Sequence, residues 1–362
     1  MKKLALFAFA VTLALVGCTN TDNKNTNNMS TLTLTQDWDK TFPKSEYVNH
    51  SKVTFKNRFG IELAADLYTP KDVSGKLPAL AVCGPFGAVK EQSSGLYAQH
   101  MAERGFVAMA FDPSFTGESA GEPRNVSSPD ICTEDYGAAV DFLSVQDYVD
   151  PERIGLIGIC GYGGFALNAA VIDTRVKATL TSTMYDISRM NANGLLGTED
   201  SAAARDAIRE RCSAQRTEDF LSGETAHDGG VPKEVPDEFP AMVKNAVNYY
   251  TTERGYHERS LNSNGGSTIT YPLSFINAPI LCYANELKSA VLMLHGENAH
   301  SRFYSETTFE KMTGVNPDGK SAKVGNKELY IVPGAVHIDL YDDKAGVIPY
   351  DKIETFFREN LK

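Results

Sequence analysis

The sequence lacks the features that mark several classes of protein. Its six cysteines include no Cys-x-x-Cys pair, so a structural zinc site has no support. Its 35 Lys and Arg residues are outnumbered by 46 Asp and Glu residues, and this acidic balance argues against nucleic acid as a partner. Its N-terminal apolar run, residues 4–16, is too short for a comfortable membrane span. What is present, 362 residues with 42% hydrophobic content, suits one large α/β domain or two smaller ones.

The N-terminus resembles a bacterial lipoprotein signal. Lys2 and Lys3 precede the apolar run, which ends in Leu15-Val16-Gly17-Cys18. The resemblance implies that residues 1–17 are removed and that Cys18 is lipidated, whereas an ordinary secretory signal would give export alone. Because Thr19 and not Asp follows Cys18, it also implies, in a Gram-negative cell, an outer-membrane anchor facing the periplasm or the exterior. The Asn- and Thr-rich residues 18–38 are expected to form a flexible tether.

From residue 39 onward, apolar runs alternate with helical patterns. Residues 47–55 and 61–68 predict an antiparallel hairpin. Continuous apolar strands separated by helices indicate an α/β fold with a mostly parallel central sheet and helices on both faces. The expected parallel strands are 80–83, 106–111, 154–158, 176–181, 291–296 and 329–334. The pattern breaks between them at 187–285, which we expect to be a helical lid insertion.

One stretch joins a buried strand to a helix and exposes a reactive side chain. It reads Gly158-Ile159-Cys160-Gly161-Tyr162-Gly163-Gly164, the pattern of a nucleophile elbow in which a cramped turn presents one residue. Cys160 would then lie at a helix N-terminus, whose unpaired amides favour the thiolate. The competing interpretation is a buried cysteine in a Gly-rich turn.

Residues at the carboxyl ends of other strands supply candidate partners, because reactive groups gather at this edge of a parallel sheet. Gly84-Pro85-Phe86-Gly87 follows strand 80–83. Since Pro85 has no N–H, we expect the Phe86 and Gly161 amides to form the oxyanion hole. His337 follows the last strand, the place of the general base in the chain order nucleophile, acid, base.

The acid of the triad has two candidates. A common hydrolase pattern puts Asp three residues after Gly296, where this chain has Ala299. Glu297 is the nearest carboxylate, and Asp186, after strand 176–181, is the alternative. His295 and His300 are too weak a pair to predict a metal, and we expect neither a metal nor a cofactor.

These stretches together resemble the α/β-hydrolase superfamily, and within it the dienelactone-hydrolase-like group with a cysteine nucleophile. The similarity covers about residues 47–361 and implies Cys160 as nucleophile and His337 as base. It implies an enzyme that hydrolyses small-molecule esters, thioesters or lactones through a Cys-His-acid triad and an acyl-enzyme. Tyr162 departs from the pattern, since a small residue is usual there, so we expect a widened turn. Besides the elbow, the residues that carry the resemblance are 84–87 with 90–92, 111–113 with 117–119, 295–297 with 299–301, and 333–334 with 337 and 340–341.

Two other functions stay open. Ala299 and Tyr162 are compatible with a catalytically silent binding lipoprotein that keeps the fold. A peptidase of the same fold is the third hypothesis, and it is disfavoured because the sequence shows neither a propeller nor an acidic cluster for an amine.

Overall fold

The computed structural model describes residues 32–72 and 74–362. The predicted signal segment 1–17 and Cys18 lie outside the described residues. Of the predicted tether, only residues 32–38 are described, and there the backbone N–H of Thr35 donates to the Glu118 carboxylate over 2.6 Å. None of the described helices is long and apolar enough to cross a membrane.

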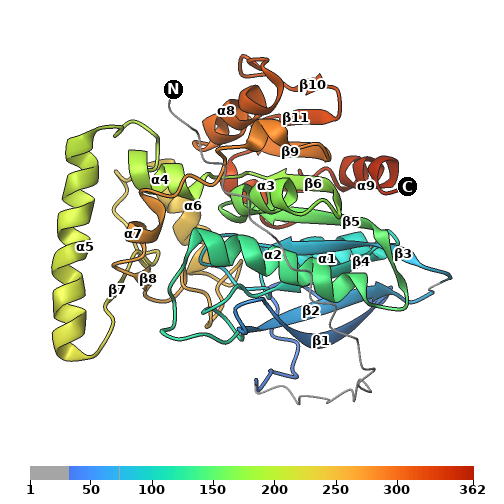
Figure 1. The fold of residues 1–362 in the computed structure, drawn as a ribbon, viewed down its shortest axis with the longest axis horizontal. Helices are drawn as coiled ribbons and strands as arrows, with labels where there is room; N and C mark the ends of the chain where they lie inside the picture. The colour runs from blue at the N-terminus through green and yellow to red at the C-terminus, as the bar shows by residue number, and fades with distance from the viewer. Residues whose placement is uncertain (1–31, 73) are drawn as a thin grey trace, which may run out of the picture. The chain divides into compact units, whose positions relative to one another are not determined.

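The described residues form one central sheet of nine strands, in the order β1-β2-β4-β3-β5-β6-β9-β11-β10 (Figure 1). Six neighbouring strands run parallel, namely β4, β3, β5, β6, β9 and β11. Strands β1 and β2 at one edge and β10 at the other pair antiparallel. The predicted hairpin and parallel strands are confirmed. The strands are β1 (Val48–Lys56), β2 (Glu62–Pro70), β3 (Leu77–Cys83), β4 (Val107–Phe111), β5 (Val149–Ile159), β6 (Val176–Ser182), β9 (Ala290–Gly296), β10 (Ala322–Val324) and β11 (Lys327–Val332).

Helices pack on both faces of this sheet, as predicted. Helices α1 (Ser93–Glu103) and α9 (Tyr350–Asn360) contact each other on one face. Helices α2 (Pro129–Ser144) and α3 (Tyr162–Ile172) contact each other on the opposite face, where α8 (Arg302–Thr313) covers β9 and β11. The parallel strands between the two helical layers are therefore buried on both sides, which is why they read as continuous apolar runs.

The chain between β6 and β9 forms a separate group of helices and two short strands, here called the cap. Its elements are α4 (Ile187–Asn193), α5 (Ala202–Ser222), β7 (His227–Asp228), α6 (Ala241–Tyr250), β8 (Ser267–Thr268), α7 (Pro272–Phe275) and η1 (Ala284–Glu286). The two longest helices of this predicted helical insertion are α5 and α6. Helix α5 lies on the far side of the cap from the sheet (Figure 1) and ends at Gly223 in the left-handed conformation, φ +74°. Glycine adopts this conformation without the steric cost of a Cβ.

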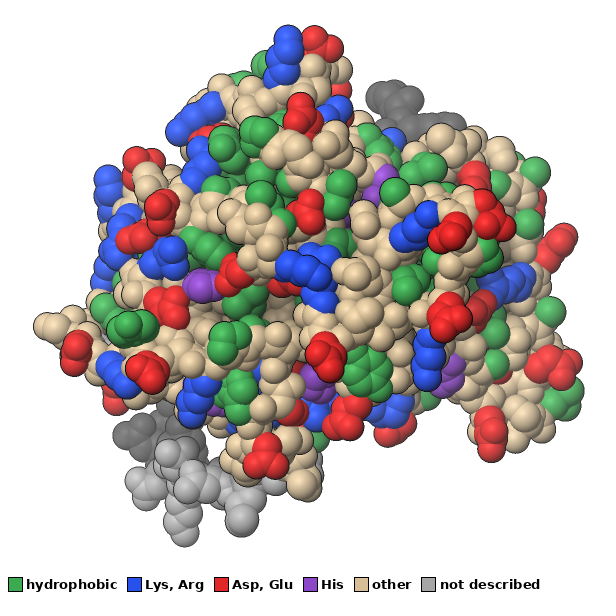
Figure 2. Space-filling model, turned by 180° about the vertical axis from the view of Figure 1, so that it is seen from behind, with side chains coloured by type: hydrophobic (Ala, Val, Ile, Leu, Met, Phe, Trp, Pro, Cys, Tyr) green, Lys and Arg blue, Asp and Glu red, His purple; other side chains and the backbone are tan. Residues whose placement is uncertain are grey.

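Charged side chains of both signs are interspersed on the surface shown in Figure 2, with Lys and Arg next to Asp and Glu. On that face the described residues form no continuous basic area. On this face, the distribution offers no continuous basic track for a polyanion.

Candidate active site

Cys160 occupies the turn between β5 and α3 with a φ of +55°. Its backbone N–H donates to the Ser182 carbonyl over 2.9 Å, and its own carbonyl accepts from the N–H groups of Gly163 and Tyr185 at 3.0 and 2.9 Å. A left-handed backbone is uncommon for a residue with a Cβ and marks a site held in place by its surroundings. The local geometry is that of a nucleophile elbow.

Tyr162 does not widen this turn, contrary to expectation. Its side chain is buried, and its hydroxyl lies 3.6 Å from the Cys132 sulfur, directed into the core. A Cβ on Gly158 would come within 2.3 Å of the Tyr162 carbonyl oxygen. The elbow therefore keeps its close approach at Gly158, and the large side chain is accommodated behind it.

Two backbone amides are directed at the Cys160 sulfur. The N–H groups of Gly161 and Phe86 both lower the pKa of the thiol by hydrogen bonding to it. The two loops approach so closely that a Cβ on Gly161 would meet the Phe86 Cβ at 2.6 Å. The structure thus brings together the two groups expected to hold an oxyanion.

Burial outweighs these favourable contacts. It raises the pKa of Cys160 to about 11, although the Tyr341 hydroxyl and the two amides act in the opposite direction. The expectation that the helix N-terminus favours the thiolate is therefore right for the sign of the amide effect and wrong for the net result. Desolvation disfavours the charged form of any buried thiol.

His337 lies in η2 (His337–Leu340), after β11, and is buried. Its Nε2 lies 2.9 Å from the Tyr341 hydroxyl, which also hydrogen-bonds with Cys160. The predicted nucleophile and base are thus brought to one place, with Tyr341 between them. No local pattern in the sequence marks Tyr341 for this bridging role.

The other ring nitrogen of His337 contacts hydroxyl groups. Nδ1 lies 2.6 Å from the Ser301 oxygen and 2.9 Å from the Thr183 oxygen. The Ser301 hydroxyl lies 2.9 Å from His295 Nε2, and His295 Nδ1 lies 2.7 Å from the Ser305 hydroxyl. Burial, with His300 and His295 nearby, lowers the pKa of His337 well below its ordinary value. Burial likewise lowers the pKa of His295 to about 3.

Neither carboxylate proposed as the acid bonds to His337 in the described residues. Glu297 is exposed, and its Oε2 accepts from the Gly334 backbone N–H over 2.8 Å. Asp186 caps α4 by accepting from the Arg189 N–H over 3.0 Å. Each carboxylate therefore serves a backbone turn, and the structure does not bring either of them to the base.

A cavity of about 730 Å³ opens onto Cys160 and His337. This volume is in the range of small-molecule sites. Most of its wall is apolar, and much of that wall comes from the cap. From cap helix α6, Met242, Val243 and Tyr250 line the cavity, whereas Tyr249 packs against Tyr341. Other apolar residues of the wall are Phe86, Ile187, Met190, Leu195, Val231 and Ile338.

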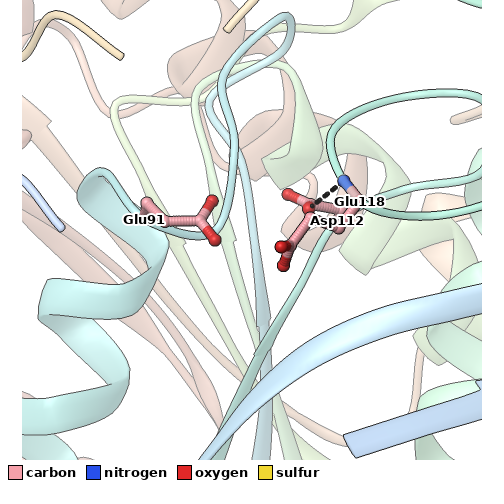
Figure 3. A group of neighbouring side chains, drawn as sticks. All are labelled: Glu91, Asp112 and Glu118. Atoms are coloured by element: carbon pink, nitrogen blue, oxygen red, sulfur yellow. Dashed lines mark hydrogen bonds between the residues drawn. The ribbon is translucent and has the colours of Figure 1, made fainter. Parts of the chain in front are cut away.

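Beside the loop of residues 84–87, here called the oxyanion loop, three carboxylates point toward a common centre, as Figure 3 shows for Glu91, Asp112 and Glu118. The Lys90 ammonium occupies that centre, with Nζ at 2.6, 2.8 and 2.7 Å from the three groups in that order. Burial alone lowers the pKa of Lys90, but Asp112, Glu91 and their neighbours raise it well above its ordinary value. The cluster is therefore a buried ion-pair network in which the Lys90 ammonium lies where a metal ion could otherwise bind.

Comparison with known families places the chain. Residues 60–312 match the model of the X-Pro dipeptidyl-peptidase (S15) family. The chain belongs to this hydrolase family. The matched segment contains the elbow, the oxyanion loop and the cap, and it ends before His337.

The chain is also similar to individual proteins. The chain is 52% identical to the uncharacterized protein PA2218 of Pseudomonas aeruginosa, over 96% of this chain and 92% of that one. It is 35% identical to the uncharacterized protein YcjY of Escherichia coli over 86% and 99% of the two chains. Thiohydrolase aneE of Aspergillus aculeatus is 37% identical over 38% of this S15-family chain and 42% of its own.

Solved structures confirm the α/β-hydrolase fold. The crystal structure of PA2218 superposes with a TM-score of 0.85 and covers 92% of this chain and 100% of that one. The α/β hydrolase GrgF from a Penicillium species superposes with a TM-score of 0.67 at 22% identity, over 86% and 99% of the two chains. At that identity the likeness establishes the fold alone.

Proposed function

We propose that this protein hydrolyses esters, thioesters or lactones with an apolar acyl group through a covalent acyl-Cys160 intermediate. The observation that carries the proposal is the position of Cys160, at a positive φ between two inward-facing amides. The same sulfur lies at the wall of an apolar cavity that also reaches His337. Nucleophile, base and oxyanion donors are the three parts that acyl transfer needs.

Attack begins from the neutral thiol. The Cys160 proton passes toward Tyr341 as the Tyr341 proton passes to His337 Nε2, while Sγ bonds to the substrate carbonyl carbon. The negative charge moves onto the carbonyl oxygen, where the Phe86 and Gly161 amides stabilise it. When the intermediate collapses, the bond to the alcohol or thiol breaks, and the leaving group takes the proton held at His337.

Water then releases the acyl group. It gives one proton to His337 and bonds through oxygen to the acyl carbon, and the carbon–sulfur bond breaks as the proton returns to Cys160. The products are a carboxylic acid and the starting thiol. A thiolate is a better leaving group than an amine, so activated acyl groups are better substrates than peptides.

Acyl-chain profiling tests the proposal. We expect p-nitrophenyl esters and acyl N-acetylcysteamine thioesters of graded length to be cleaved, and Cys160→Ala to lower kcat/KM by at least about 10³-fold. Mass spectrometry of the intact protein should show an acyl adduct on Cys160 during turnover. Equal turnover by wild type and Cys160→Ala would exclude the mechanism.

Peptide cleavage is the second candidate, favoured by the name of the matching family. Alanyl-prolyl-p-nitroanilide distinguishes the two activities. Turnover of this amide at a kcat/KM comparable to that of the best thioester would favour the peptidase.

A silent binding protein is the third candidate, favoured by the absence of a carboxylate bonded to His337 in the described residues and by the neutral thiol at Cys160. It predicts saturable binding of an acyl ligand with no adduct on Cys160. The acyl-adduct measurement therefore separates it from the hydrolase.

We further propose that Cys18 is lipidated and anchors the protein at the cell envelope, on the outer membrane if the cell is Gram-negative. The support is the Leu15-Val16-Gly17-Cys18 sequence after two lysines. Cys18→Ser should abolish labelling by an alkyne fatty acid and move the protein out of the membrane fraction. Unchanged labelling would contradict the anchor.

A further inference from the structure

The surroundings of His337 contain no charged partner among the described residues. The titratable groups that face its ring are Tyr185, Tyr341, His295 and His300, and Tyr341 in turn hydrogen-bonds with Cys160. Asp339, two residues further along, accepts a bond from the Val336 N–H over 2.9 Å. In a usual triad a carboxylate at Nδ1 fixes the tautomer of the base and stabilises its charged form. Here another group must fix the tautomer.

Ser301 lies where that carboxylate would be. Its hydroxyl joins His337 Nδ1 to His295 Nε2, and Ser305 closes the chain at His295 Nδ1. Ser301, His295 and Ser305 are all fully buried. The Thr183 hydroxyl is a second oxygen at His337 Nδ1. The backbone of Thr183 has a φ of +45°, a strained conformation for a β-branched residue. Strain of this kind at a buried contact points to a functional constraint.

The number of protons on these groups fixes the direction of donation along this series of hydrogen bonds. A hydroxyl has one proton, and a neutral imidazole has one N–H and one lone pair. For His337 to accept at Nε2, its Nδ1 must carry the proton and donate it to Ser301 and Thr183. Ser301 then donates to His295 Nε2, and His295 Nδ1 donates to Ser305. Every group in this order is neutral and satisfied, whereas the reversed order would leave His337 unable to act as a base.

We propose that Ser301 and His295 are the positioning residues of this site, and that they replace the triad carboxylate with an uncharged hydrogen-bond relay. The proposal rests on the proposed roles of Cys160 and His337. It has one chemical consequence that a carboxylate would not have. The relay fixes the tautomer of the base but does not stabilise an imidazolium, so His337 stays neutral at rest and no thiolate–imidazolium pair forms. The lowered pKa of His337 agrees with this state.

The first measurement is spectroscopic and needs no substrate. In ¹⁵N-histidine-labelled full-length protein, His337 should stay the Nδ1-protonated neutral tautomer from about pH 8 down to about pH 5, where an ordinary histidine is already protonated. Wild type and His337→Gln spectra assign the signal. A doubly protonated His337 at about pH 6, or the Nε2-protonated tautomer, would overturn the relay.

The second measurement introduces a carboxylate at position 301. Ser301→Asp should raise the pKa of His337, move the acid limb of the kcat/KM profile up by at least about one pH unit, and speed iodoacetamide alkylation of Cys160 at pH 7 by about tenfold or more. A carboxylate this close to His337 Nδ1 stabilises the imidazolium, which the serine hydroxyl does not. An unchanged profile in folded Ser301→Asp would therefore contradict the proposal.

The third measurement removes the relay. Ser301→Ala and His295→Leu should lower kcat by about 10²-fold with little change in KM. His295→Gln should recover part of that loss, because its amide oxygen can accept from Ser301. Thr179→Val, which removes another fully buried hydroxyl on β6, should leave kcat within about twofold. Loss of activity in Glu297→Gln with retention in Ser301→Ala would refute the relay and restore the carboxylate triad.

Failure of the relay and failure of the proposed function give different results. If wild type and Cys160→Ala turn over ester alike, the hydrolase proposal fails, while the tautomer and alkylation measurements still decide what holds His337.

Discussion

At the scale of single residues, Cys160 lies in surroundings that oppose its own ionised form. The residue is 8% exposed, two backbone amides donate to its sulfur and the Tyr341 hydroxyl contacts it, yet burial raises the pKa of the thiol to about 11. The same donors that fail to ionise the thiol are placed to stabilise an oxyanion, which forms only after attack. Their stabilisation is therefore larger in the transition state than in the resting enzyme, the condition for a gain in rate.

The resting thiol leads to a prediction for alkylation. Because the thiolate is the nucleophile, the iodoacetamide rate at Cys160 should rise about tenfold per pH unit from about pH 7 to pH 10. Cys282→Ser protein should be used, since Cys282 is the exposed cysteine among those described. Peptide mapping assigns the adduct. A rate that levels off below about pH 8 would indicate a preformed thiolate and contradict the prediction.

Gly161 permits the close approach of the two oxyanion donors. A Cβ at this position would meet the Phe86 Cβ and the Ile187 Cδ1, each at 2.6 Å. Gly161→Ala must therefore displace Phe86 and its amide, and we expect kcat to fall by about 10²-fold to 10³-fold.

The control for Gly161→Ala is Gly137→Ala in α2, where the nearest atom to an added Cβ is 3.9 Å away. It should leave kcat unchanged and stabilise the protein by about 0.5–1 kcal/mol, since alanine is the better helix residue. Equal activity in the two variants would show that Phe86 is not a donor.

At the scale of elements, the cap holds the oxyanion loop as well as shaping the cavity. Asn262 donates from its side chain to the Phe86 carbonyl over 2.8 Å, and its backbone N–H donates to the Gly87 carbonyl over 3.0 Å. Ser260 adds a hydroxyl bond to the same Gly87 carbonyl at 3.0 Å. The orientation of the Phe86 peptide therefore depends on a segment more than 170 residues away in sequence.

This dependence can be measured with Asn262→Ala. Loss of the side-chain bond frees the Phe86 carbonyl, so we expect kcat to fall by about tenfold while KM changes little. Asn277→Ala is the matched control, since Asn277 is exposed on the cap and contacts Arg209 at 3.5 Å. A fall in kcat of the same size in both variants would indicate general loosening of the cap and not a local effect on the loop.

The sequence predicted elements best where local signals are strong. The parallel strands and the elbow follow from apolar runs bounded by glycines, and the fold is confirmed. Helix α8 was missed because buried polar residues, Ser305 and Thr308, interrupt its apolar face, so its hydrophobic period is weak. Strand β10 has only three residues, too few to show alternation.

The partners of His337 could not be predicted in the same way. Ser301 follows β9 and Thr183 follows β6, and they meet His337 only where these segments come together. Glycine spacing and carboxylate position are visible in a sequence, but a neutral hydroxyl at an imidazole nitrogen has no motif. In the sequence, the candidates for the acid are therefore the carboxylates near the right strand ends, Glu297 and Asp186, and both bond to backbone turns instead.

At the scale of the whole molecule, the ion-pair network around Lys90 joins three distant parts of the chain. Lys90 follows the oxyanion loop, Asp112 follows β4, and Arg259 from the cap contacts Glu91 and Asp39 at 2.9 and 2.6 Å. Such a network gives little net stability relative to an apolar core, because desolvation offsets the Coulomb attraction. Removing Lys90 is different, since the buried carboxylates of Glu91, Asp112 and Glu118 all lose the counter-charge that they share.

Lys90→Met makes this asymmetry measurable. The variant leaves Glu91, Asp112 and Glu118 close together without the ammonium between them, so we expect a loss of about 3–5 kcal/mol in the free energy of unfolding by urea. Lys177→Met, which removes a largely exposed pair with Glu152, should change it by less than about 1 kcal/mol. The Lys90→Met loss should shrink as the pH falls and protonates the stranded carboxylates, because neutral carboxyl groups no longer need a counter-charge. A loss equal to that of Lys177→Met, or one that grows toward acid pH, would show that the network does not hold the cap and the sheet together.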